Sequence, residues 1–233
     1  MLPGVTLTGL HGFDRRLRDL APPGPPGLSC GVILGTATEM VENPNACGGI
    51  AYSGGNLTVE PSFVGGGNYA AVTGTPGGAC VPPSAIAYVG GPRIFEFTIV
   101  QKSATPETIA VGFKFPSTSG LSDGVLWYSD GSVIGFPSFE NLGASAAFGT
   151  GDVLTFACCQ GESRFWIAKN GVWQAPGAPA AGTGRVSASN WVGQTFAPKV
   201  GFLGGETVHR IVTVNLAGPF ATGTPTGFIP VGA

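Results

Sequence analysis

The sequence predicts an all-β chain, an antiparallel two-sheet β-sandwich with a short N-terminal arm. Three observations predict this class. First, 40 of the 233 residues are Gly and 20 are Pro, and both residue types are unfavourable inside helices. Second, hydrophobic residues make up 43% of the chain and charged residues only 10%, which argues against disorder. Third, short segments with period-two alternation follow one another between Gly-rich turns, as in antiparallel hairpins.

The first 29 residues differ from the rest and form the predicted arm, with residues 30–233 as the sandwich. GFDRRLRDL is helix-like because Phe13, Leu17 and Leu20 recur at helical spacing. APPGPPG follows as a semi-rigid spacer. We interpret this segment as a docking arm, and a disordered tail is the alternative. The candidate docking residues are Phe13, Arg15, Arg16, Leu17 and Leu20.

Alternating segments begin near residue 45 and are expected to form eight or more strands. In one of them, Phe95, Phe97 and Ile99 share a face, which we expect to be the core face. Two hairpin turns are expected at Asp130-Gly131 and Asn170-Gly171. The expected strand and hairpin segments are 55–60, 93–100, 108–115, 124–135, 152–159, 164–174, 196–203 and 209–216.

The cysteines are odd in number and sparsely spaced, at positions Cys30, Cys47, Cys80, Cys158 and Cys159. No CxxC pair is present and the two His residues lie far apart, so no metal site is predicted. Cys158 and Cys159 are adjacent in a strand-like run, so we expect them to point to opposite faces as small core residues. One pair among the other three is a candidate disulfide, and the spacing leaves its identity open.

Charge and hydropathy exclude several classes of protein. The formal net charge is −2 and no basic block is present, so we expect no nucleic-acid partner. No apolar run reaches the length of a membrane span. The N-terminal segment carries its charges after its apolar residues, so we expect no secretory signal and synthesis in the cytoplasm. No phosphate-binding loop is present, and no cofactor is expected.

Catalytic constellations are not found in the sequence, so the chain is expected not to be an enzyme. His11 lies in the arm and His209 in an expected strand, which leaves no well-placed histidine for a nucleophile–histidine–acid triad. No strand carries the paired carboxylates of a glycosidase. Carboxylates such as Asp130 and Asp152 fall at expected turns, where they cap the backbone.

Several segments follow one another in a distinctive order. They are RIFEFTIV, IAVGF and VLWYSDGSVI, then FGTGDVLTFACCQGESRFWIAKNGV, and finally FAPKVGF and VTVNLAGPF. In this order they resemble the aromatic strands and hairpin, the most specific stretch and the closing strands of a SPRY domain of the phage and bacterial type. The resemblance implies a bent, concanavalin-like jelly-roll sandwich that binds ligands through loops at one edge. Two features depart from the family: Asn215-Leu216-Ala217 replaces its usual NFG, and the 174–195 loop is longer.

The resemblance and the arm together suggest a non-enzymatic structural protein on the virion surface of a tailed bacteriophage. It would be a head decoration, head fibre or tail-fibre component, with other virion proteins as partners and a host-surface glycan or protein as ligand. Low charge and abundant Gly suit packing against identical copies, so a homo-oligomer is expected. The alternative is a soluble carbohydrate- or peptide-binding module of a bacterium. The candidate ligand-binding residues are Trp127, Tyr128, Asp130, Arg185 and Trp191.

Overall fold

The structure is a computed structural model that describes residues 28, 30, 50–54, 57–61, 90–102, 108–114, 124–136, 140–186, 195–203 and 210–233. Nearly all of its regular structure is β-strand, and two short 3-10 helices, η1 and η2, complete it. The elements are β1 (Ile50–Ser53), β2 (Thr58–Pro61), β3 (Pro92–Gln101), β4 (Thr108–Lys114), β5 (Gly124–Tyr128), β6 (Ser132–Phe136), β7 (Glu140–Ala144), β8 (Val153–Cys159), η1 (Gln160–Glu162), β9 (Arg164–Lys169), β10 (Val172–Trp173), η2 (Pro179–Ala181), β11 (Arg185–Val186), β12 (Ala197–Leu203), β13 (Ile211–Asn215) and β14 (Ile229–Pro230).

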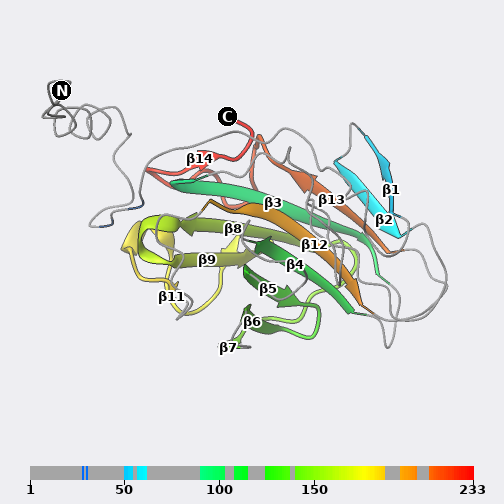
Figure 1. Cartoon of the computed structure of the whole chain (residues 1–233), viewed down its shortest axis with the longest axis horizontal. Coiled ribbons are helices and arrows are strands. Elements are labelled where there is room, and N and C mark those ends of the chain that lie inside the picture. The colour runs from blue at the N-terminus through cyan, green and yellow to red at the C-terminus, as the bar shows by residue number, and fades with distance from the viewer. Residues whose placement is uncertain are drawn as a thin grey trace, which may run out of the picture.

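The strands form two sheets, as the sequence predicts. The large sheet has the order β1-β2-β13-β3-β8-β9-β10, with β11 also paired to β9 and β14 paired to β3. The small sheet has the order β12-β4-β5-β6-β7. Figure 1 shows β3, β8 and β9 side by side, with β4, β5 and β6 in the other layer. All pairs are antiparallel except β14 with β3, which is parallel.

The inner faces of the two sheets enclose the main core. Phe95, Phe97 and Ile99 of β3 all point into it and are fully buried, which confirms the face predicted by alternation. Phe95 lies opposite Phe156 of β8, and their rings stack with centroids 5.5 Å apart. Burying one such side chain contributes about 1.5–3 kcal/mol, so this layer holds the sheets together.

A second apolar cluster covers the outer face of the large sheet. We call it the outer cluster, and its buried members are Cys30, Ile94, Ala157, Cys159, Trp166, Phe220 and Phe228. Strand alternation explains the division, because residues next to those of the inner core point outward. The outer face is therefore closed by chain segments from both before β1 and after β13.

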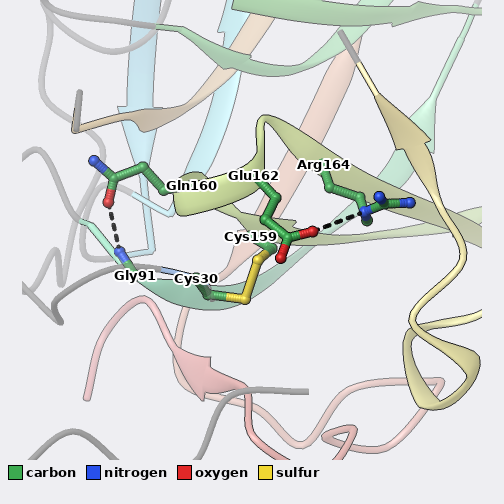
Figure 2. Close-up of a disulfide and its surroundings, with 6 residues drawn as sticks. All are labelled: Cys30, Gly91, Cys159, Gln160, Glu162 and Arg164. Atoms are coloured by element: carbon green, nitrogen blue, oxygen red, sulfur yellow. Dashed lines mark hydrogen bonds and ion pairs between the residues drawn. A yellow bond between two sulfur atoms is a disulfide. The ribbon is translucent and has the colours of Figure 1, made fainter. Parts of the chain in front are cut away.

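The two adjacent cysteines lie on opposite faces of β8, as expected. Cys158 points into the inner core as a free thiol, and burial raises its pKa well above the ordinary value. Cys159 points outward, but it is bonded to Cys30 with an S–S distance of 2.04 Å (Figure 2). Cys159 is therefore buried in a core cluster, as expected. The expectation that Cys30 pairs with Cys47 or Cys80 is wrong, because its partner is Cys159. Cys47 and Cys80 lie outside the described residues.

Both predicted hairpin turns are present, whereas some strands were not predicted. Asn170 and Gly171 have φ angles of 51° and 80°, the left-handed values that an Asn-Gly hairpin turn requires. β7 was not predicted because its ENLGA sequence is largely exposed and lacks apolar alternation. The structure contains no helix, within its described parts, that has the length and apolar character to cross a membrane.

Candidate binding surface

Trp127 of β5 lies in the inner core and is not exposed. Its side chain has 0% exposure and packs edge-on against Phe148, with ring centroids 5.5 Å apart. Because β5 alternates, Trp127 shares the inward direction with Val125. This placement corrects the expectation that Trp127 offers a stacking face to a ligand.

Tyr128, the next residue, points to the opposite face of the small sheet. It is half-buried and packs against the buried pair Ala110 and Leu126, with Ile134 beside it. Part of the ring is therefore accessible on the outer face of the small sheet. The two adjacent aromatics do not form one surface, because a strand sends consecutive side chains to opposite sides.

Asp130 is exposed at the tip of the β5–β6 hairpin. Its Oδ1 accepts hydrogen bonds from the hydroxyl of Ser132 at 2.7 Å and from the Ser132 N–H at 2.9 Å. These bonds, the hydroxyl first, lower the pKa of the Asp130 carboxyl below its ordinary value. The carboxylate is therefore charged and accessible at neutral pH, as the sequence-based hypothesis of a ligand contact requires.

Arg185 of β11 is buried, with 5% exposure, and its guanidinium spans the edge between the two sheets. Its acceptors are the carbonyl oxygens of Leu142 (2.9 Å), Gly143 (3.3 Å), Ala144 (3.1 Å) and Ala175 (2.7 Å) and the hydroxyl of Ser145 (2.6 Å). Burial lowers the pKa of the guanidinium. Because Nη1 and Nη2 donate to the chain itself and the residue is buried, Arg185 supports the loops. Its expected role as a direct ligand contact is therefore corrected.

The described part of the 174–195 loop does approach the β5–β6 hairpin, as the hypothesis required. Ser145 is the link, because it accepts from Arg185 and its own N–H donates to Gly131 O at 2.8 Å. Gly131 has φ 97°, and a Cβ there would meet Ser145 O at 2.4 Å. Only glycine fits this close approach, so the contact depends on the Asp130-Gly131 turn.

Asp152 caps a turn, as the sequence predicts, but sequence reasoning missed the polar group that it forms beside the Asn170-Gly171 turn. Asp152 forms an ion pair with Lys169 at 2.9 Å, and its carboxylate accepts from Asn170 Nδ2 and Gly149 N–H, each at 2.8 Å. Lys169 also donates to Ala147 O at 2.7 Å. The signal was present in the sequence as a carboxylate and an Asn-Gly turn, but their contact depends on the register of β8 against β9.

These contacts fix one end of the sandwich, which we call the turn surface. The segment 145–152 lies between the two hairpin turns, because Phe148 N–H donates to Ser129 O and Lys169 holds Ala147 O. The exposed residues of the turn surface include Asp130, Ala146, Thr150, Asn170 and Val172. Val172 is 65% exposed, so the surface combines polar groups with one large apolar side chain.

Several predicted site residues lie outside the described part of the chain. They are Trp191 and the docking residues Phe13, Arg15, Arg16, Leu17 and Leu20. Both histidines lie outside it as well. Among the described residues, no group of three or more His, Cys, Asp or Glu side chains is placed to hold a metal ion.

Comparison with solved structures finds SPRY domains among the similar folds. The SPRY domain of human HERC1 is 16% identical, with 71% of this chain and 91% of that chain covered and a TM-score of 0.49. Another human SPRY domain is also 16% identical, with 73% and 97% covered and a TM-score of 0.48. A Trypanosoma rangeli sialidase is 8% identical, with 93% and 36% covered and a TM-score of 0.40. No family model and no curated protein sequence matches the chain.

Proposed function

We propose that the chain is a non-enzymatic binding module on the surface of a tailed-bacteriophage particle. In this proposal the N-terminal arm attaches to the particle, and the sandwich presents the turn surface to a host-surface glycan or protein. The oligomer expected from the composition would array several such surfaces on one particle.

The disulfide Cys30–Cys159 is the main observation that supports a location on the particle surface. Thiol reductants keep most cytosolic cysteines reduced, whereas disulfides persist on virion and cell surfaces. A chain that is synthesised in a host cytoplasm and then carried outside on a particle would form this bond after release. The disulfide therefore favours a working environment outside the cytosol.

The carboxylates of Asp130 and Asp152 support a binding role over a catalytic one. Burial alone raises the pKa of Asp152, but hydrogen bonds from Gly149, Lys169 and Asn170 outweigh burial and hold it below the ordinary value. The pKa of Asp130 is lowered as well. A general acid needs a raised pKa to carry a proton at neutral pH. Both carboxylates instead act as acceptors that fix the turns.

The fixed shape of the turn surface supports recognition of a partner. Arg185, Ser145 and Asp152 bind backbone groups of this region before any ligand arrives. A site that is ordered in advance loses less conformational freedom on binding. Within the original candidate set, Asp130 remains available to orient a ligand hydroxyl or amide, and Tyr128 offers a partly exposed ring.

Mass spectrometry of purified particles tests the location. We expect the chain as a stoichiometric component of the virion, and we expect deletion of residues 1–29 to abolish its attachment. Its absence from particles would overturn the proposed location. Selective ligand binding without particle association would instead support the soluble bacterial module.

A glycan array with the full chain tests the binding role. We expect Asp130→Asn to weaken selective binding by roughly tenfold, the loss of one charge-assisted hydrogen bond. Glu162→Gln is the matched control, because Glu162 lies in η1, beyond the end of β8 that is opposite to the turn surface. Its carboxylate pairs with Arg164 there. Equal binding by both variants and the unmodified chain would remove Asp130 from the site.

A further inference from the structure

Leu28 and Cys30, which precede β1 in the sequence, touch the outer face of the large sheet. Leu28 is half-buried against the outer cluster, and Cys30 is buried within it. Among the described residues, the hydrogen bond that holds these two residues runs from Gly161 N–H to Cys30 O at 3.1 Å. The covalent bond to Cys159 is their other attachment (Figure 2).

The chain after β13 lies on the same outer face with a much larger set of non-covalent bonds. β14 pairs with β3 at Ile229 and Pro230. Arg93 donates to Pro230 O at 3.0 Å and to Ala233 O at 3.2 Å. Glu96 Oε2 accepts the Ala221 N–H at 2.7 Å. Hydrogen bonds and strand pairing therefore hold the C-terminal segment on the sheet, and no disulfide is needed.

The disulfide lies outside the inner core, because both of its cysteines belong to the outer cluster. Cys158, which faces that core, is a free thiol, and Cys159 faces away from it. Cys30 and Cys159 are separated by 129 positions, and the strands paired around Cys159, β3 and β9, are joined to β8 by their own ladders. Loss of the S–S bond therefore removes no contact between the two sheets.

We infer that the Cys30–Cys159 disulfide is a reducible clamp that holds Leu28 and Cys30 on the outer face of the large sheet. Ordering a chain segment costs conformational entropy. One backbone hydrogen bond, with the burial of Leu28 and of the small Cys30 side chain, does not offset that cost. Reduction releases both residues while the sandwich and its C-terminal segment stay folded. The release uncovers part of the outer cluster. The clamp is a property of the chain itself and goes beyond the proposed function.

The chemistry of release is thiol–disulfide exchange with a dithiol reductant. Cys30 is 4% exposed and Cys159 is 0% exposed, so we expect a reductant thiolate to attack Cys30 Sγ. The attack forms a mixed disulfide with Cys30 and expels the Cys159 thiolate, which takes up a proton. The second thiol of the reductant then displaces Cys30 Sγ, which also leaves as a thiol after protonation. The dithiol is oxidised to its cyclic disulfide by two electrons, and the protein gains two electrons and two protons.

Amide hydrogen exchange on the purified full chain, followed by NMR before and after treatment with dithiothreitol, tests this inference. We expect the Gly161 amide to exchange at least about tenfold faster after reduction, because its acceptor on Cys30 leaves. The Ala221 amide, held by Glu96, and the amides of β8 should keep their rates. Mass spectrometry of alkylated Cys30 verifies that the bond has been reduced.

Two variants separate the clamp from other effects of cysteine loss. Cys30→Ser should give the fast Gly161 exchange without reductant and should not respond to it. Cys158→Ala removes the neighbouring free thiol and should keep the response of the unmodified chain. Slow Gly161 exchange after verified reduction would overturn the inference, because apolar contacts would then suffice. Faster exchange throughout β8 and at Ala221 would also overturn it, because the bond would then hold the whole fold.

Discussion

Arg185 Nη2 donates a 2.6 Å hydrogen bond to Ser145 Oγ. This contact joins the large sheet to the small sheet beside the edge strand β7. Arg185 belongs to β11 of the large sheet, whereas Ser145 follows β7, the edge strand of the small sheet. The same guanidinium also binds three carbonyl groups of residues 142–144. An edge strand leaves backbone groups unpaired, so Arg185 occupies acceptors that β7 cannot satisfy within its sheet.

Replacing Arg185 with Met should therefore destabilise the fold. The substitution keeps the aliphatic stem but removes every donor, which leaves the part-buried carbonyl oxygens without this partner. Loss of several hydrogen bonds from one buried charged group costs about 2–4 kcal/mol in the free energy of unfolding. Equilibrium unfolding in urea, followed by tryptophan fluorescence, measures this loss.

Arg164→Met is the matched control for this measurement. Arg164 lies on the neighbouring strand β9, and its ion pair with Glu162 at 3.5 Å is partly exposed to solvent. Pairs of this kind contribute roughly 0–1 kcal/mol. An Arg185→Met loss no greater than the Arg164→Met loss would contradict the supporting role of Arg185.

The two buried tryptophans allow a sharper prediction. Trp127 and Trp166 are 0% and 1% exposed. Trp166 Nε1 donates to Thr183 O at 2.7 Å, whereas Trp127 Nε1 has no hydrogen-bond partner within the part of the chain that the structure describes. Trp127→Phe therefore removes a donor that is already unsatisfied, and Trp166→Phe leaves a carbonyl without its partner. We expect Trp166→Phe to cost about 1–2 kcal/mol more than Trp127→Phe.

Thermal unfolding of the two phenylalanine variants, measured side by side, checks this order. Both substitutions remove a similar volume from a packed region, so the cavity terms largely cancel in the comparison. A larger loss for Trp127→Phe would show that its indole nitrogen has a partner in solution. Loss of ligand binding by Trp127→Phe without any loss of stability would restore Trp127 to the binding surface.

Local sequence patterns predicted the layers and turns of this fold because those features depend on neighbouring residues. Alternation in β3 placed Phe95 and Phe97 on the core face, and the Asn170-Gly171 pair fixed a hairpin. β7 escaped prediction because its exposed residues show no such alternation. A strand of this kind is defined by its partners, which the local sequence does not reveal.

The candidate site was harder to predict because it depends on contacts between distant segments. The alternation of Trp127 and Tyr128 implied opposite faces, but both faces of β5 carry apolar residues, so the pattern did not reveal which one was buried. Arg185 became structural only because residues 142–145 lie within its reach. The Cys30–Cys159 pairing likewise joins positions that no local pattern relates.

The Asp152 carboxylate should make stability depend on pH in the acid range. Burial favours its neutral form, but the bonds from Gly149, Lys169 and Asn170 outweigh burial, so its pKa in the folded chain is lowered. Its stabilising contribution is therefore complete above the unfolded pKa, near about 3.9. The contribution is lost as pH decreases through the lower pKa of the folded chain.

Urea unfolding of Asp152→Asn and the unmodified chain at about pH 7 and about pH 3 checks this dependence. The difference in free energy of unfolding between them should shrink at the lower pH. Lys169→Met is the companion variant, because removal of the cation should raise the Asp152 pKa in an NMR titration. Parallel stability curves for Asp152→Asn and the unmodified chain would show that the carboxylate has an ordinary pKa.

Gly112 in β4 should be irreplaceable, because β5 passes too close for any side chain. A Cβ at this position would lie 1.9 Å from Val125 O and 2.9 Å from Val125 C, and both are backbone atoms that cannot move without separating β4 from β5. Overpacking of a buried site commonly costs about 1–3 kcal/mol, and this contact is closer than a repacked side chain can relieve. We expect Gly112→Ala to lose at least about 3 kcal/mol in the free energy of unfolding or to be recovered as insoluble protein.

Gly149→Ala is the control for this prediction, because a Cβ there meets nothing within 4 Å. Its melting temperature should stay close to that of the unmodified chain. A soluble Gly112→Ala variant that melts together with Gly149→Ala would mean that β4 and β5 are paired in a different register.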